Sequence, residues 1–580
     1  MKQEIIKILK KYKLLMLIEI IFIIINVYCI AYPSKIVGQI IDLLYNIDQN
    51  KAQIYNWIIY LAISCFGILV TRLVWKNIDF NLDIKISKDL KDRLFEKLMK
   101  SKIQEINSIK NGEIMSYFVS DTKIIARTLS ALVSVGTRII IYLAITVYMM
   151  SDACNLKLTI LSFIPILITI IIVILIRNKV YFSYRKAKKC FTDLSECVQE
   201  STDSIRTMKA FVGEEKQNKN FKEKNNNLRV AGLEVSKNQN IFDICINIGF
   251  GISYAISILY GSKLVIDGQI TVGDMVAFNG YLANLEMPVT WIPWMIKRYK
   301  KFLISYERLN NMFKLKEEKI HIDYKKYDGF EGSIEVKNLT YNYPGFIEKV
   351  LENISFQVSK GETLGIIGTI GSGKTTLMNL LLKLYDVENG KIFIDGQDIN
   401  DIPTTKIRQN ICYITQDSFL FSASLKENIN LFRDEYEDEK IEESTKKALI
   451  YDDIADMKEG IYTTIGEKGI DLSGGQKQRV VISRAFLNNS DIVIFDDTFS
   501  ALDNRTEQHV LENIKELTKD KTCIIISNRI SDIKNCDKII VLEHGKILER
   551  GNHDSLIEMQ GKYYEFFQNQ ANRSDESFLN

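Results

Sequence analysis

Long apolar segments are confined to the first half of the chain, and each is close to the length of a membrane-spanning helix. Six runs show this pattern: 14–32, 54–75, 130–150, 158–176, 241–264 and 272–296. A bilayer requires about 20 residues of helix, so the pattern predicts six transmembrane helices. In front of them, residues 1–13 place isoleucines beside lysines, which is typical of a short helix lying on the cytoplasmic membrane surface.

The connections between these runs alternate between short and long. The two long connections, 76–127 and 177–237, are rich in Lys and Arg. Positive charge marks the cytoplasmic side of a membrane protein, so we expect both termini in the cytoplasm. Apolar residues recur at helical spacing in both connections, which predicts helices extended into the cytoplasm.

The ionisable residues inside the apolar runs include Glu19, Arg138 and Asp243, with Glu286 near the end of the sixth run. Such residues line a pathway or pair with each other in many membrane proteins. Residues of this kind also lie near the interface and extend their charged ends into water. Both interpretations stay open at this point.

The second half alternates strand-like and helical segments, as in a soluble α/β protein. We therefore expect a membrane α-helical domain over 1–318, an α/β domain over 333–571, and a disordered tail over 572–580. The 580 residues carry 75 Lys+Arg and 72 Asp+Glu, a balance that provides no overall field for nucleic acid. The nine cysteines include no C-x-x-C pair, which argues against a disulfide framework or a zinc site.

A phosphate-binding loop follows the predicted strand 363–367. The sequence GTIGSGKTT contains Gly368, Gly371, Ser372, Gly373, Lys374, Thr375 and Thr376. Glycines let the backbone wrap a phosphate, and the N-terminus of the following helix adds positive potential. Lys374 is expected to reach the β- and γ-phosphates, and Thr375 to hold Mg²⁺.

Two further segments complete this chemistry. Residues 492–495 form an apolar strand that ends in Asp496, a carboxylate suited to the Mg²⁺ shell. A second anion cradle opens a helix with Ser473, Gly474, Gly475 and Gln476.

Together the segments GTIGSGKTT, LSGGQKQR, IVIFDD and SALD, in this order, resemble the nucleotide-binding domain of ABC transporters. The six-span domain in front resembles that of half-transporters of the exporter type (type IV). The resemblance implies that Tyr343 stacks on adenine and that Gln416 contacts Mg²⁺ and reports the nucleotide state. It also implies that 103–108 and 208–213 are coupling helices.

The resemblance further implies a dimer that binds two ATP molecules with Mg²⁺. Each site takes the phosphate-binding loop of one chain and, in trans, residues 473–476 of the other. We therefore expect a second ABC half-transporter as partner, in contact with membrane lipid, and no nucleic acid. The location implied is a plasma membrane, with the nucleotide-binding domain in the cytoplasm, and the usage rich in Lys, Ile and Asn suggests a bacterium.

Two positions depart from the family pattern. Asp497 stands where the family has the glutamate that polarises the attacking water, and its carboxylate falls about 1–1.5 Å short, a misplacement that can cost about 10²-fold in rate. Asn528 stands where the family has a histidine, and it cannot shuttle a proton. These catalytic positions predict a site that holds ATP but hydrolyses it poorly, as in one member of a heterodimeric exporter.

Two alternatives remain. One is a homodimeric exporter with slow turnover through Asp497, and the other is a regulatory switch that binds ATP without driving transport. Soluble ABC ATPases are excluded by the membrane runs. The residues do not distinguish a drug, a lipid or a peptide as the substrate.

Overall fold

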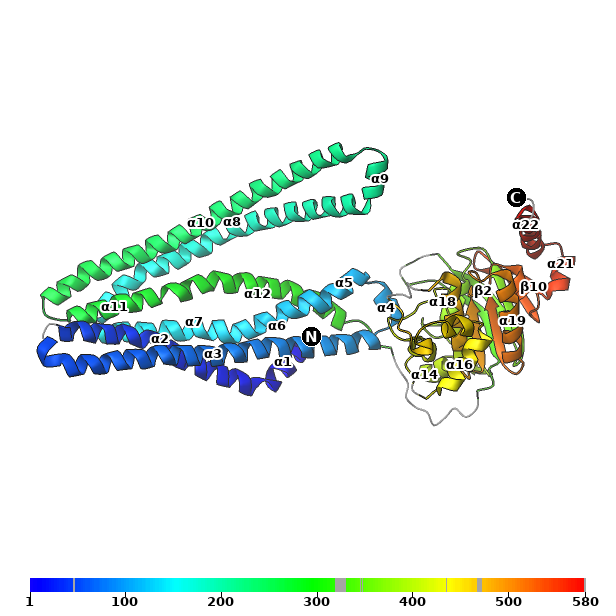
Figure 1. Ribbon diagram of the computed structural model, residues 1–580, viewed down its shortest axis with the longest axis horizontal. Coiled ribbons are helices and arrows are strands. Elements are labelled where there is room, and N and C mark those ends of the chain that lie inside the picture. The colour runs from blue at the N-terminus through cyan, green and yellow to red at the C-terminus, as the bar shows by residue number, and fades with distance from the viewer. Residues whose placement is uncertain are drawn as a thin grey trace. The chain divides into compact units, whose positions relative to one another are not determined.

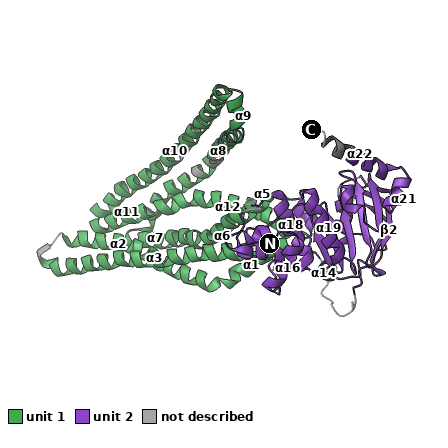
Figure 2. Ribbon diagram, turned by 45° about the vertical axis from the view of Figure 1, so that its right-hand side comes forward, with its two compact units in different colours: residues 1–100, 109–315 green, residues 101–108, 316–580 purple. Residues whose placement is uncertain are grey.

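The computed structural model describes residues 1–577, except 45–46, 319–329, 345, 347, 434 and 467–471. The chain divides into two compact units (Figure 2). The first comprises Met1–Lys100 and Ile109–Leu315, and the second comprises Ser101–Ser108 and Lys316–Asn580. The predicted linker between the two domains lies largely outside the described residues, and the assignment of 101–108 to the second unit was not predicted.

The first unit is helical (Figure 1). Its α-helices are α1 (Lys2–Lys11), α2 (Lys13–Leu43), α3 (Ile47–Lys100), α5 (Asn111–Ser116), α6 (Thr122–Ala131), α7 (Thr137–Ala153), α8 (Leu156–Asp203), α9 (Ile205–Ala210), α10 (Glu214–Ile266), α11 (Val272–Asn284) and α12 (Glu286–Phe313). Two π-helical turns, Tyr117–Asp121 and Leu132–Gly136, flank α6. Helices α8 and α10 pack along one another and are joined by α9, so the long connections are helical as predicted.

Five helical segments of the described chain are long and apolar enough to span a membrane: Lys13–Leu43, Gln49–Lys100, Asn111–Ala153, Leu156–Ile176 and Glu214–Ile266. The sixth predicted run is divided at Leu285 between α11 and α12, and α11 has only 13 residues. Polar and proline residues in this run lower its hydropathy and interrupt the helix. Helix α2 also continues through Pro33, where we expected the first span to end; membrane helices tolerate proline when neighbouring groups satisfy the backbone.

Helices α2 and α11 contact each other through glycines. A Cβ added to Gly38 would lie 2.4 Å from the carbonyl oxygen of Gly273. Beside this contact, Asp42 accepts hydrogen bonds from the Gly273 amide at 2.7 Å and the Thr271 hydroxyl at 2.6 Å. Small residues permit this approach of two backbones, which is common where membrane helices pack.

The second unit contains two sheets. The strands are β1 (Ile334–Tyr341), β2 (Leu351–Val358), β3 (Thr363–Gly368), β4 (Ile392–Ile394), β5 (Gln397–Asp398), β6 (Ile411–Ile414), β7 (Ile492–Asp496), β8 (Thr522–Ile526), β9 (Lys538–Glu543) and β10 (Lys546–Gly551). A four-stranded antiparallel sheet has the order β2-β1-β4-β5, and a six-stranded sheet has the order β10-β9-β3-β8-β7-β6. In the larger sheet, the neighbours from β9 to β6 are parallel.

Helices cover the larger sheet. They are α13 (Lys374–Leu381), α14 (Thr404–Asn410), α15 (Leu425–Asn430), α16 (Asp438–Lys447), α17 (Tyr451–Ala455), α18 (Gly474–Leu487), α19 (Asn504–Leu517), α20 (Ile530–Ile533), α21 (His553–Glu558) and α22 (Lys562–Ser577); α4 (Ile103–Asn107) joins this unit from the first half of the chain. Every residue of β7 and β8 is buried, as expected for central parallel strands covered on both faces.

Helix α22 continues to Ser577, whereas we expected a disordered tail from residue 572. The segment contains no Gly or Pro to end the helix that begins at Lys562. Residues 578–580 lie outside the described residues.

Candidate functional site

The site is built where the parallel strands end. Strands β3, β8, β7 and β6 are consecutive neighbours in the larger sheet. Ligands of open α/β sheets bind beyond the carboxyl ends of such strands. The loops that follow these four strands begin with Thr369, Ser527, Asp497 and Thr415, so the predicted site residues meet at one edge.

Glycines allow the loop after β3 to adopt its path. Gly373 has φ +101°, and a Cβ there would lie 2.7 Å from the Leu351 side chain. Gly371 has φ +81° and open space around it. A Cβ at Gly368 would lie 1.9 Å from the carbonyl oxygen of Leu542. The backbone of this loop therefore requires glycine at these positions, and α13 begins directly behind it.

Lys374 lies over its own loop. Its Nζ donates hydrogen bonds to the carbonyl oxygens of Gly368 at 2.7 Å and Thr369 at 3.1 Å, and to Asn528 Oδ1 at 3.2 Å. Burial lowers the pKa of Lys374, and the negative charges of Asp496 and Asp497 oppose this effect. A phosphate in the loop would favour the charged amine in the same way.

Ser372 provides a direct test of whether this loop fits an anion. The residue is 2% exposed, and its hydroxyl has no hydrogen-bond partner. A buried hydroxyl without a partner costs about 1–3 kcal/mol. It is therefore a donor aimed into a loop whose backbone and helix terminus already favour phosphate.

Asp496 ends β7 and is 2% exposed. The Tyr413 hydroxyl donates to its Oδ2 at 2.9 Å. Burial raises the pKa of Asp496, while hydrogen bonds from Tyr413 and Thr375 lower it. Asp496 and Thr375 therefore lie together.

Oxygen donors of this kind suit Mg²⁺. Thr375, Gln416 and Asp496 are the residues that would hold the ion, which when bound would neutralise charge on the phosphates. Sequence reasoning missed Tyr413, because no local pattern shows that its hydroxyl reaches β7.

Asp497 and Asn528, the two positions that depart from the family pattern, follow the neighbouring strands β7 and β8. Asp497 has φ +46°, and its Oδ2 accepts a hydrogen bond from Gln416 Nε2 at 3.1 Å. Asn528 contacts Lys374 through its side chain. Its carbonyl oxygen accepts a hydrogen bond from Gln570 Nε2 at 2.7 Å, and Gln570 Oε1 accepts one from the Ile530 amide at 2.9 Å. Gln570, on α22, fastens the loop after β8 and was not predicted.

Ser473 caps α18 in a reciprocal arrangement. Its hydroxyl accepts a hydrogen bond from the Gln476 amide, and its own amide donates to Gln476 Oε1 at 3.0 Å. Gln476 Nε2 also donates to Asp453 Oδ1 at 2.7 Å. A Cβ at Gly475 would lie 3.1 Å from the carbonyl oxygen of Ala501, and one at Gly474 would be in ordinary contact with Ala501. The backbone of the cradle is therefore held by hydrogen bonds within the chain itself.

Within the described part of the chain, residues 473–476 form no hydrogen bond with residues 368–376. The two cradles therefore make no hydrogen bond with each other within the described chain. Residues 467–471, which are separated from the second cradle by Leu472, lie outside the described residues.

Tyr343 reaches the first cradle from the other sheet. Its hydroxyl lies 3.0 Å from Thr376 Oγ1 on α13. Its ring makes edge contacts with Tyr341 at 5.4 Å and Tyr385 at 5.3 Å between centroids. The predicted adenine-stacking residue is thus one member of a tyrosine cluster beside the loop.

Helix α4 contacts this same cluster. Asn107 Nδ2 lies 3.4 Å from the Tyr385 hydroxyl, and Lys102 Nζ lies 2.6 Å from Asp386 Oδ2. The predicted first coupling segment, 103–108, therefore coincides with a short helix beside the tyrosine cluster. The second predicted segment, 208–213, overlaps the end of α9 in the helical unit.

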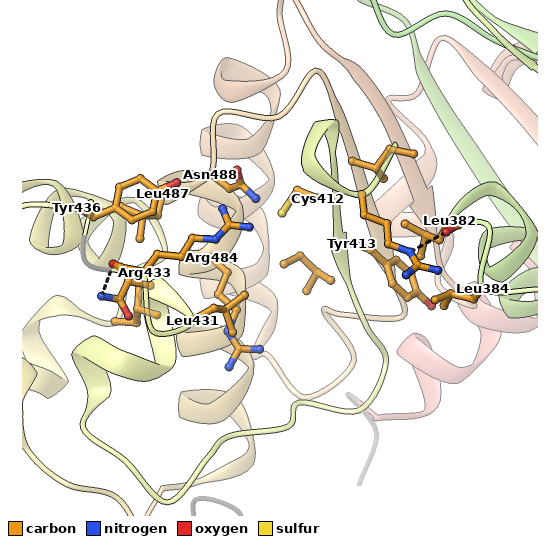
Figure 3. A pocket seen from close by; sticks show the side chains of 15 residues that line it. Leu382, Leu384, Cys412, Tyr413, Leu431, Arg433, Tyr436, Arg484, Leu487 and Asn488 are labelled. Atoms are coloured by element: carbon orange, nitrogen blue, oxygen red, sulfur yellow. Dashed lines mark hydrogen bonds between the residues drawn. The ribbon is translucent and has the colours of Figure 1, made fainter. Parts of the chain in front are cut away.

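A cavity of about 330 Å³ lies beside the site (Figure 3). Arg433, Arg484 and Asn488 line it together with Cys412 and Tyr413, so the tyrosine that bonds Asp496 also forms part of its wall. The phosphate-binding loop contributes no lining residue. Arg484 donates to the carbonyl oxygens of Asn428 at 2.9 Å and Phe419 at 3.1 Å, which ties α18 to the segment after β6.

The fold and this geometry define a P-loop ATPase domain attached to a helical membrane domain. The description "ABC transporter" matches residues 351–500, and "ABC transporter transmembrane region" matches residues 16–289. The multidrug resistance-like ATP-binding protein MdlA of Buchnera aphidicola subsp. Baizongia pistaciae is 30% identical over 552 residues, which cover 94% of each chain. The chain therefore belongs to the ABC transporter family.

Other relatives agree. The ATP-dependent lipid A-core flippase of Haemophilus influenzae is 31% identical over 494 residues, covering 83% of this chain and 82% of that protein. A bacterial Atm1-family ABC exporter with ATP bound shares the fold, with a TM-score of 0.81 and 24% identity over 97% of this chain and 98% of that chain. The protein is an ATPase-coupled transporter that passes several times through the bacterial plasma membrane, with its nucleotide-binding domain in the cytoplasm.

Proposed function

We propose that this chain is one half of a heterodimeric ABC exporter and that its own ATP site binds nucleotide but hydrolyses it poorly. The observation that carries the proposal is the contrast around Lys374. The groups for binding, including Asp496 and the unpaired Ser372 hydroxyl, are present. Asp497 and Asn528 occupy the two positions where hydrolysis requires a longer carboxylate and an imidazole.

The second cradle, residues 473–476, is intact and supports the same proposal. In a dimer, Ser473, Gly474, Gly475 and Gln476 serve the site whose phosphate-binding loop belongs to the partner. A partner half-transporter with glutamate and histidine at the two positions would then form one active site with this chain. Binding of ATP with Mg²⁺ closes the dimer, and hydrolysis at the active site resets it.

We assign the transmembrane domain to 1–318, with six spans and both termini in the cytoplasm, and the nucleotide-binding domain to 333–571. The relatives include proteins named for multidrug resistance and for lipid A-core flipping. We therefore propose an amphiphilic substrate, a drug, lipid or peptide, that is exported across the plasma membrane.

The test is ATP turnover of the full chain purified alone in lipid, with ATP binding measured in the same sample. We expect saturable ATP binding, and turnover no higher than that of Asp497→Asn. Co-expression of the partner half-transporter should then restore turnover. Asp520→Asn, which changes an exposed carboxylate away from the site, is the matched control.

A homodimeric exporter is the second candidate, because Asp497 is still a carboxylate and is held by Gln416. Steady turnover of the chain alone that disappears in Asp497→Asn and persists in Asp520→Asn would establish it and overturn the heterodimer. A dimer that includes the natural partner, binds ATP and never hydrolyses it would instead identify a regulatory switch.

A further inference from the structure

Arg138 lies near the start of α7, inside the third predicted span, and its guanidinium is enclosed by aromatic rings. Its Cζ lies 4.7 Å from the ring centroid of Trp291, 5.1 Å from Trp75 and 5.6 Å from Tyr142. These rings come from α12, α3 and α7. The side chain is therefore directed into a junction of three helices.

The surroundings of this junction are apolar. Trp75 and Tyr142 are 8% and 4% exposed, and they pack with the fully buried Ile23 and Val27 of α2. Cation–π contacts stabilise a desolvated guanidinium by about 2 kcal/mol. They do not neutralise its charge, and Arg138 Nε has no hydrogen-bond partner.

Two donors at the junction lack acceptors. Arg138 Nε and Trp75 Nε1 are buried and have no hydrogen-bond partner. Among the residues that the structure describes, no Asp or Glu forms an ion pair with Arg138; the groups that act on it are the Tyr142 hydroxyl, to which the guanidinium donates a hydrogen bond, and the like charge of Arg72. The site therefore has an excess of donors and of positive charge.

The contrast with Glu19 shows why this excess matters. Glu19 is fully buried, and both of its carboxyl oxygens also lack partners. A carboxylate can lose its charge by binding a proton, whereas arginine remains charged in proteins. A charge that cannot be discharged inside a membrane requires a counter-charge, and the described residues of this chain supply none to Arg138.

We infer that Arg138, with Trp75, Tyr142 and Trp291, binds the negatively charged group of an amphiphilic organic anion. A guanidinium holds carboxylate, sulfonate or phosphate oxygens with paired N–H donors, and the rings receive the apolar body. This inference rests on the proposed export function and specifies its substrate class. Of the other ionisable residues in the predicted spans, Asp243 and Glu286 are exposed in this chain and form no part of the site.

The test compares two xanthene dyes of similar shape and opposite charge, carboxyfluorescein and rhodamine 123. The full chain is placed in phosphatidylcholine nanodiscs, and binding is followed by fluorescence anisotropy. We expect carboxyfluorescein to bind more tightly than rhodamine 123. Arg138→Gln should weaken carboxyfluorescein binding about tenfold or more, since a hydrogen bond to a charged group is lost, and should leave rhodamine 123 binding unchanged or stronger.

Arg138→Lys keeps the charge without the planar donors and should fall between the wild type and Arg138→Gln. Arg185→Gln, which removes an exposed arginine on α8, should bind both dyes like the wild type. If the arginine had only a packing role, Arg138→Gln would change the thermal midpoint and affect both dyes equally. That outcome, or equal binding of the two dyes by the wild type, overturns the inference.

Nanodiscs that contain phosphatidylglycerol identify the source of the anion. Competition by this lipid would mean that the site takes an anionic headgroup, and absence of competition would mean that it takes a solute. ATP binding is measured in every sample. Loss of dye discrimination with intact ATP binding contradicts only the anion site, whereas absence of ATP binding contradicts the proposed function itself.

Discussion

The phosphate-binding loop and the cradle at 473–476 are both anion sites at helix N-termini, but they differ in what surrounds them. Around Lys374, the catalytic positions are occupied by Asp497 and Asn528, whose side chains contact Gln416 and Lys374. Around Ser473, the capping box with Gln476 and the hydrogen bond from Gln476 to Asp453 hold residues 473–476 in place, and all four residues match the family motif. In the proposed heterodimer, this chain keeps the half-site that it lends to its partner and loses catalysis at the half-site that it retains. The predictions below test this difference.

The largest effect is expected from Gly475→Glu in the assembled transporter. The new side chain would start 3.1 Å from the Ala501 carbonyl oxygen and would place a negative charge in an anion cradle. We expect ATP turnover to fall by about 10²-fold or more, comparable to the loss of a preorganised electrostatic contact.

Lys374→Ala is the comparison for this variant. It should remove ATP from this chain's own loop and lower turnover by less than tenfold. Equal losses in the two variants would mean that both half-sites serve catalysis, and would contradict the asymmetry. ATP binding at the Lys374 loop verifies that Gly475→Glu is folded.

The second-largest effect is a gain in ATP hydrolysis. Asp497→Glu adds the missing methylene, and we expect hydrolysis by the chain alone to rise about tenfold. The gain stays below the full 10²-fold for two reasons: Asn528 is unchanged, and the φ of +46° at this position suits Asp better than Glu. Single-turnover release of phosphate measures it.

The double variant Asp497→Glu/Asn528→His should exceed the single variant. If neither variant exceeds the wild type, the defect lies elsewhere in the chain. Asp497→Asn is the matched control, because it keeps the size of the side chain and removes the carboxylate.

A smaller effect is expected from Asp453→Ala. This change removes the acceptor for Gln476 and the 3.0 Å ion pair with Arg479, so the second cradle loses its support but not its donors. Turnover of the assembled transporter should fall about three- to tenfold, in line with the loss of a charge-assisted hydrogen bond at a partly exposed position. Asp452→Ala changes the exposed neighbour and should have no effect. A full loss of turnover would mean that Asp453 acts directly on ATP.

The smallest effect is expected from Gln570→Ala. The variant removes the two hydrogen bonds that fasten the loop from Asn528 to Ile530, each contributing about 0.5–1.5 kcal/mol. We expect faster amide hydrogen exchange at Ile530 and unchanged ATP affinity. Gln568→Ala, on the same helix, loses only a contact with Tyr564 and provides the baseline. Unchanged exchange in Gln570→Ala would show that α22 does not hold this loop.

Most of the nucleotide-binding unit could be predicted from local sequence patterns. The strand, glycine loop and helix around Lys374 are contiguous, and the apolar run before Asp496 predicts a buried strand, so both were found from the sequence. The convergence of these segments follows from parallel strand order. Tyr413 and Gln570 were missed because their contacts depend on segments 83 and 42 residues away in the chain.

The membrane unit was less predictable, because its main features are breaks in helices and contacts between helices. Apolar runs indicate that helices exist, but they do not indicate where a continuous helix divides. The reciprocal cap of Thr271 and Asp274 marks the start of α11, but the apolar pattern does not mark the break after this helix, at Leu285. The aromatic enclosure of Arg138 brings together three helices, and no spacing rule along one of them reveals it.

The contact between Gly38 and Gly273 has a mechanical consequence. Sliding one helix past another normally proceeds by exchange of side-chain rotamers, and here the touching surfaces are backbone. A shift by one turn, about 5.4 Å, would bring Asp42 or Ser34 of α2 to the place that only a glycine fits. The contact therefore fixes α2 and α11 in one register relative to each other. We therefore expect the two helices to move together during a transport cycle, and the movement that opens either side of the membrane to occur at other helix contacts.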